Sequence, residues 1–127
     1  MKTGSCLCGA VKYEASNLRD VIACHCEQCR KQTGNYLSAT AALDSDFSIT
    51  EGRGLKWYRS STTATRGFCG ECGSVLFWKG DGENTISITA GTLDGKSGLK
   101  LKGHIFCAFA GDYYEISGGE YKRDAWK

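Results

Sequence analysis

Short segments in which apolar and polar residues alternate run along most of this chain of 127 residues, divided by glycine-rich or acidic turns. Alternation with a period of two is typical of strands that bury one face and expose the other. It predicts strands over residues 10–15, 37–43, 47–50, 55–59, 62–69, 74–79, 85–93, 104–109 and 113–116. The run Gly80-Asp81-Gly82 predicts a hairpin turn between two of these strands.

No segment shows a long helical period, and residues 27–33 are predicted to form one or two turns of helix after the cysteine cluster. Seventeen glycines and no prolines fit strands joined by glycine turns. The chain has no repeat, low-complexity tract or linker, and its length suits one domain with a modest core. We therefore expect a mainly β fold, built from short antiparallel strands in a single domain over residues 1–127.

Composition narrows the range of partners. Hydrophobic residues make up 41% and charged residues 24% of the chain, as in ordinary soluble globular proteins. The net charge of +2 is too small to indicate nucleic acid or an anionic membrane as the main partner. Neither an apolar signal-peptide region nor a transmembrane run is present. We expect a cytoplasmic protein whose cysteines are reduced.

The candidate chemistry lies in the cysteines. Seven of the eight fall into three tight groups: Cys6 and Cys8; Cys24, Cys26 and Cys29; Cys69 and Cys72. Thiolates one or two residues apart bind a soft tetrahedral ion, usually zinc. A disulfide framework is the alternative, but a Cys-x-Cys pair converges locally instead of joining distant segments. Seven thiolates complete one four-ligand site and leave a second site with three protein ligands and an open position.

The spacing favours a closed structural site formed by Cys6, Cys8, Cys69 and Cys72. Each of these two pairs lies in a tight turn followed by a glycine, which allows backbone amides to point at the sulfurs. Such a site would close a loop of roughly sixty residues and staple the fold. Spacing alone also permits a different quartet, formed by Cys24, Cys26, Cys69 and Cys72.

The remaining group could be closed by a fourth ligand, either Cys107 or His25. We expect Cys107 to be a buried core thiol instead, because on a strand it shares a face with Ile105 and Phe109. His25 stands between two cysteines, and its ring is expected to point away from an ion bound by both.

Three segments carry a resemblance to a known family: residues 4–13 (GSCLCGAVKY), 24–34 (CHCEQCRKQTG) and 68–74 (FCGECGS). In this order they resemble the glutathione-dependent formaldehyde-activating enzyme family. Residues 90–94 (AGTLD) and 104–106 (HIF) are similar to later motifs of the family. The resemblance extends from about residue 4 to residue 117 and implies a zinc-centred β-tent fold.

The resemblance also implies two zinc ions with different roles. A structural zinc is implied at Cys6, Cys8, Cys69 and Cys72, and a labile zinc at Cys24, Cys26 and Cys29. The implied reaction joins glutathione and formaldehyde into S-hydroxymethylglutathione, which is a carbon–sulfur lyase activity in the reverse sense. Cys107 matches no functional position of the family.

An open three-thiolate zinc suits thiol chemistry better than hydrolysis. Anionic ligands make the metal a poorer acidifier of water than three neutral histidines do. A substrate thiol could take the open position as a thiolate and attack formaldehyde held beside it. We therefore expect Cys24, Cys26 and Cys29 to be the catalytic group.

Glutathione has two carboxylates and one ammonium, so its pocket should contain cations. Arg30 and Lys31 directly follow Cys29 and are the best-placed candidates for binding it. Further candidates are Arg53, Lys56, Arg59 and Arg66. His25 and Glu27 are candidate proton acceptors, and His25 could instead orient its neighbours through a hydrogen bond.

Two other functions fit the same cysteines. The first is a non-catalytic zinc module that binds partner proteins, in which the second cysteine group only shapes a loop. The second is a redox enzyme that uses Cys107 as its reactive thiol, and the strand setting of that residue argues against it.

Overall fold

The computed structural model describes residues 1–127 and is mainly β, which confirms the predicted fold class. The elements in chain order are β1 Lys2–Ser5, β2 Lys12–Ala15, β3 Val21–Cys24, α1 Glu27–Thr33, β4 Leu37–Leu43, β5 Phe47–Glu51, β6 Leu55–Arg59, β7 Ala64–Cys69, β8 Val75–Gly80, β9 Thr85–Thr89, β10 Leu101–Ile105 and β11 Tyr121–Lys122. Three single-turn 3-10 helices lie at Asp44–Asp46, Ala90–Thr92 and Cys107–Phe109. None of the helices is long and apolar enough to cross a membrane.

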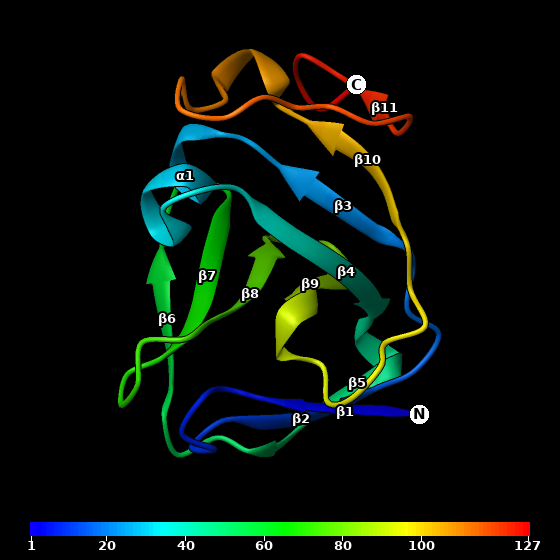
Figure 1. Ribbon diagram of the computed structural model, residues 1–127. Helices are drawn as coiled ribbons and strands as arrows, with labels where there is room; N and C mark the ends of the chain where they lie inside the picture. Colours follow the sequence, from blue (N-terminus) through cyan, green and yellow to red (C-terminus); the bar gives the residue numbers. More distant parts are fainter.

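The strands form two sheets (Figure 1). Strands β1, β2 and β5 make a three-stranded antiparallel sheet, which lies at the base of Figure 1. The larger sheet has the strand order β11-β10-β3-β4-β9-β8-β7-β6 and bends over the smaller one. Most neighbours are antiparallel, but β10 runs parallel to both β3 and β11. Alternation along the chain does not predict these parallel pairings.

The core lies between the two sheets and reaches the first cysteine group. The Tyr13 ring packs edge-on against Phe77, with ring centroids 5.5 Å apart. The Tyr13 hydroxyl is hydrogen-bonded to Thr92 Oγ1 at 2.7 Å, so this buried polar group is satisfied. Cys6 and Cys69 belong to the same buried cluster. The two sheets and these cysteines therefore form one packed unit.

Helix α1 has the predicted bounds, and its ends explain why. The Cys26 side chain caps its N-terminus by accepting a hydrogen bond from the Cys29 amide at 3.3 Å. Gly34 ends the helix in the left-handed conformation, with φ at +81°, as glycine does after many helices. Hydrogen bonds from Gln28 to the Ser60 carbonyl and from Arg66 to Gln32 join α1 to the β6–β7 part of the sheet.

The predicted strand at 104–109 is wrong in its second half. Phe106 adopts a left-handed backbone conformation with φ at +56°, which a strand does not allow, so β10 ends at Ile105. Cys107 lies in the following 3-10 turn and is half-buried. It is therefore not the core strand thiol that the alternation predicted. The predicted strand at 85–93 is likewise shorter, because β9 gives way to a 3-10 turn after Thr89.

No strand forms at 113–116. Tyr113 and Tyr114 do not point to opposite faces as strand residues would, because their rings contact each other, with centroids 5.2 Å apart. Strands β1, β3 and β11 were not predicted. The β3 segment is apolar at every position, although its residues alternate between buried and half-buried, so its sequence has no polar positions that would indicate a strand with one exposed face.

Candidate metal centres and the groove between them

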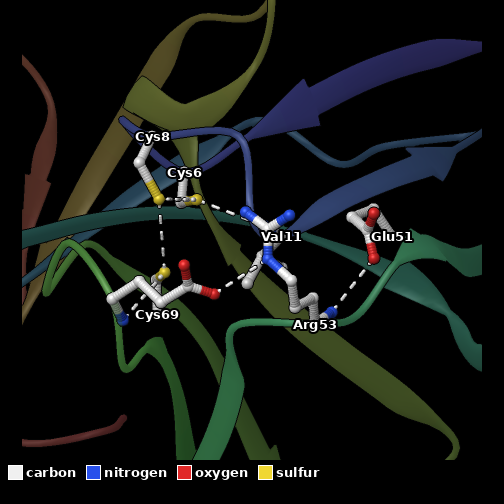
Figure 2. Close-up of polar contacts among 7 residues, drawn as sticks. Cys6, Cys8, Val11, Glu51, Arg53 and Cys69 are labelled. Atoms are coloured by element: carbon white, nitrogen blue, oxygen red, sulfur yellow. Dashed lines mark hydrogen bonds and ion pairs between the residues drawn. The ribbon is translucent and has the colours of Figure 1, made fainter.

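The first cysteine group consists of four thiols whose sulfurs all lie within 4.8 Å of one another: Cys6, Cys8, Cys69 and Cys72. The Cys8 sulfur is 3.7 Å from that of Cys6 and 3.8 Å from that of Cys69 (Figure 2). Four thiolates about 2.3 Å from a tetrahedral zinc lie about 3.8 Å from one another. The spacing in this quartet therefore fits zinc.

Two tight turns supply the quartet. The glycine after the second cysteine of each turn has a positive φ, +84° at Gly9 and +81° at Gly73. A side chain at either position would be strained, because L-residues rarely adopt this conformation. The backbone amides of Val11 and Glu71 donate to the first sulfur of their turns, at 3.2 and 3.4 Å. Amide donors of this kind stabilise thiolates.

Ser74 connects the two turns. Its hydroxyl oxygen accepts a hydrogen bond from the Leu7 amide at 3.0 Å and lies 3.2 Å from the Cys72 sulfur. The hydrogen bond from the Ser74 hydroxyl is the main cause that lowers the pKa of the Cys72 thiol, to about 5. The backbone hydrogen bond from Ala10 lowers the pKa of the Cys8 thiol, but desolvation and then Cys72 outweigh it and raise this pKa to about 12. The first thiolate of the quartet is therefore favoured at Cys72 rather than at Cys8.

The second group is a trio whose three sulfurs lie within 4.8 Å of one another, from Cys24, Cys26 and Cys29. Cys24 ends β3, Cys26 caps α1, and Cys29 is buried in the first helical turn. No histidine, carboxylate or further cysteine completes the group. Cys107 and His25, the two candidate fourth ligands, both lie outside it. The trio therefore leaves one position of a tetrahedral ion open.

The close sulfurs favour loss of a proton from the trio. Side-chain hydrogen bonds from Cys24 and then Cys29 are the leading causes that lower the pKa of the Cys26 thiol, to about 2. The positive charge of Arg66 acts in the same direction. The pKa of Cys24 is raised, chiefly by its hydrogen bonds to Cys26 and Cys29, so the first thiolate of the trio forms at Cys26 and a bound metal would release the remaining protons. The all-sulfur donors of both groups favour zinc.

Of the cations considered for substrate binding, Arg66 alone contacts the trio: its Nη1 lies 3.5 Å from the Cys29 sulfur. Lys31 is exposed and forms an ion pair with Glu27 at 3.6 Å. Arg30 is half-buried on α1. Arg53 and Arg59 form exposed ion pairs away from the trio, and Figure 2 shows Arg53 near Cys6, Cys8 and Cys69 of the quartet. Sequence reasoning ranked Arg66 below Arg30 and Lys31, since it follows no cysteine directly.

A groove of about 380 Å³ lies between the two cysteine groups. On one side Leu37 and Val75 pack around the trio, and on the other Ser74 bonds to the quartet. The full lining is Thr33, Tyr36, Leu37, Ser38, Ser74, Val75, Thr89, Gly91 and Thr92. It is uncharged and rich in hydroxyls. Neither this groove nor a smaller hollow of about 200 Å³ on the three-stranded sheet is lined directly by a cysteine, but only the groove shares residues with the surroundings of the two cysteine groups.

The sequence of residues 1–109 matches the family of glutathione-dependent formaldehyde-activating enzymes. The protein belongs to this family. A protein of Schizosaccharomyces pombe named an uncharacterized lyase is 28% identical over 116 residues, which cover 90% of this chain and 84% of that protein. The crystal structure of a Rhodobacter sphaeroides protein has a TM-score of 0.64 at 29% identity, covering 76% of this chain and 91% of the other.

In this member of the glutathione-dependent formaldehyde-activating enzyme family, His25 lies between two cysteines of the trio and is hydrogen-bonded to residues outside it. His25 is 1% exposed, and burial, followed by the nearby His104, lowers its pKa. Its Nε2 lies 2.9 Å from His104 Nδ1, and its Nδ1 lies 2.8 Å from the Tyr114 hydroxyl. Both ring nitrogens are occupied, so His25 holds the turn between β3 and α1. The partners lie 79 and 89 residues away, and no local signal predicts them.

Replacing Tyr114 by phenylalanine should destabilise the folded protein by about 1–3 kcal/mol, because a buried imidazole nitrogen would lose its partner. Tyr113→Phe is the matched control: its hydroxyl bonds to the exposed Gly34 carbonyl at 3.0 Å, and the side chain is 60% exposed. That change should cost less than about 0.5 kcal/mol. Urea unfolding of the zinc-loaded variants measures both. Equal losses would show that the bond to His25 has no special weight.

Proposed function

We propose that this protein is a zinc-dependent carbon–sulfur lyase that joins glutathione, or a similar low-molecular-weight thiol, to formaldehyde and forms S-hydroxymethylglutathione. The observation that carries the proposal is the trio of cysteines with one open ligand position, next to an uncharged groove. Family membership and a relative named as a lyase support a formaldehyde-activating or lyase activity.

The two cysteine groups have different proposed roles. The quartet holds a structural zinc, because its four ligands leave no open position and two of its cysteines belong to the core. The trio of Cys24, Cys26 and Cys29 holds a labile zinc and forms the catalytic group. When bound there, zinc supplies a position at which a substrate thiol is present as thiolate at neutral pH.

The reaction needs few groups from the protein. The thiol loses its proton, its sulfur forms a bond to the formaldehyde carbon, and the carbonyl electron pair moves to oxygen, which takes up a proton. No oxidant or reductant is required. The uncatalysed addition is already feasible, so holding the two reactants together supplies much of the acceleration. Leu37 and Val75 line the groove and also pack against the trio, so they form the proposed apolar contact between a substrate in the groove and the cysteines.

The groove suits a small peptide-like thiol. Its hydroxyl-bearing residues, among them Ser38, Ser74 and Thr92, offer donors and acceptors to amide groups without a fixed charge. The carboxylates of glutathione are assigned to Arg30 and Lys31 at the α1 side. The exposed ion pair between Lys31 and Glu27 does not prevent this, because exposed pairs contribute only about 0–1 kcal/mol.

Two-dimensional exchange NMR tests the proposed function. Formaldehyde, glutathione and their hydroxymethyl adduct interconvert slowly, and zinc-loaded protein at catalytic concentration should accelerate the exchange. Glutathione alone and the metal-free protein serve as controls. Acceleration only with zinc-loaded protein is the expected result. Exchange at the background rate would contradict the lyase activity and favour a non-catalytic zinc module of the same fold.

A further inference from the structure

Arg66 is a buried cation without a carboxylate partner. Arg66 is only 6% exposed, and it takes part in none of the ion pairs of the protein. Nη1 contacts the Cys29 sulfur at 3.5 Å and Gln32 Oε1 at 3.0 Å, while Nε is buried without any partner. A buried charge costs several kcal/mol unless an opposite charge compensates it. The opposite charge beside Arg66 is the cysteine trio.

The position of Arg66 is fixed by its strand. It lies within β7, paired with Tyr58 on β6 and with Trp78 on β8. Because side chains alternate across a strand, Arg66 and Cys69 leave β7 on opposite faces. One face of β7 thus contributes Cys69 to the quartet, and the opposite face places the Arg66 guanidinium next to the trio. Gln32 on α1 accepts a hydrogen bond from Arg66 Nη1, so the position of the guanidinium is fixed by both β7 and α1.

Charge counting indicates what this arrangement favours. Three thiolates around a divalent ion carry a net charge of −1, and a fourth thiolate brings it to −2. In a partly buried site this excess negative charge opposes binding of the fourth thiolate. One fixed positive charge at contact distance returns the total to −1. A neutral fourth ligand does not add charge and gains little from the guanidinium.

We propose that Arg66 is a positioning residue that selects an anionic sulfur ligand over a neutral one at the open position of the trio. The guanidinium acts through Cys29 and through the net charge of the group, without touching the reacting atoms. This inference rests on the proposed function, since it assumes that a substrate thiol occupies that position.

The test uses full-length protein loaded with Co²⁺, which accepts tetrahedral thiolate sites and absorbs visible light. Glutathione is titrated into the wild-type protein and the Arg66→Gln and Arg66→Lys variants, and the sulfur-to-cobalt charge-transfer band reports binding. Imidazole is titrated separately as a neutral ligand. Arg59→Gln is the matched control, because Arg59 lies on β6, next to β7, and the change removes the same charge from an exposed ion pair with Asp81. The quartet has no open position, so its unchanged bands show that each variant is folded.

Arg66→Gln should raise the dissociation constant of glutathione at least about tenfold, as expected for losing one charge at contact distance. Its imidazole affinity should stay within about threefold of the wild-type value. Arg66→Lys and Arg59→Gln should bind both ligands like the wild type.

Three results would overturn the inference. In the first, wild-type protein binds glutathione and Arg66→Gln binds it equally well. In the second, both ligands weaken together in Arg66→Gln, which would show a general structural role. In the third, Arg66→Lys loses glutathione binding although the charge is kept, and this variant decides the matter if Arg66→Gln does not fold. If the wild-type protein itself gives no response to glutathione, the proposed function fails and this inference fails with it.

Discussion

Replacing Cys69 by serine is expected to leave the chain largely unfolded and unable to retain its structural zinc. Cys69 is fully buried, belongs to the main core cluster, and lies 3.8 Å from the Cys8 sulfur. Binding of a structural zinc contributes about 10–16 kcal/mol to folding in small zinc domains. Whole domains are stable by only about 5–15 kcal/mol, so a damaged quartet removes most of the margin. Circular dichroism and zinc content per chain measure the effect.

Cys107→Ser provides the control for this experiment. Cys107 is half-buried in a 3-10 turn and belongs to neither cysteine group. Its replacement should leave the spectrum, the zinc content and the activity close to those of the wild type. A Cys69→Ser protein that is folded and holds two zinc ions per chain would refute the structural role of the quartet.

Replacing Cys26 by serine is expected to reduce the lyase activity to the background rate while the fold is retained. The loss should exceed about 100-fold, because even changes to groups behind metal ligands cost 10–100-fold. Serine is the right substitute at this position. The Cys26 side chain caps α1 by accepting from the Cys29 amide, and serine is among the best residues for an N-cap. The helix therefore survives while one sulfur of the trio is lost.

Exchange NMR measures the activity of Cys26→Ser. Circular dichroism shows whether the variant is folded, and zinc content shows how many metal ions it retains. The expected protein is folded, retains about one zinc per chain and is inactive. Cys26→Ala separates the two roles of the residue, because it should lose the cap as well, at about 1 kcal/mol. If Cys26→Ser were as unfolded as Cys69→Ser, the division into a structural and a catalytic group would be wrong.

Local sequence was sufficient for the parts of the site that are local in structure. The helix at 27–33 and the two glycine turns depend on neighbouring residues, and the structure shows them where they were predicted. Each turn delivers its sulfurs together, but spacing alone left open which turns share a site, and the structure brings Cys6 and Cys8 to Cys69 and Cys72. The assignment of metal ions and catalytic roles to these groups remains a prediction.

Contacts between distant segments were beyond local reasoning. His25 and His104 meet because β3 and β10 are parallel neighbours, and nothing in either segment indicates that pairing. Arg66 was undervalued because arginines are mostly exposed. Its position three residues before Cys69 did carry a signal, since an odd spacing places two strand side chains on opposite faces. The left-handed backbone conformation of Phe106 could not be predicted, because bulky residues rarely adopt it.

The shared strand β7 has a consequence for how the protein responds to scarce zinc. Cys69 and Arg66 leave the same strand on opposite faces, so under the proposed roles an intact quartet keeps β7 in place and, with it, the guanidinium beside the trio. We expect the trio to lose its metal before the quartet does, because it offers only three protein ligands. A cell short of zinc would then hold folded but inactive molecules, and a returning supply of zinc would reactivate them without new synthesis.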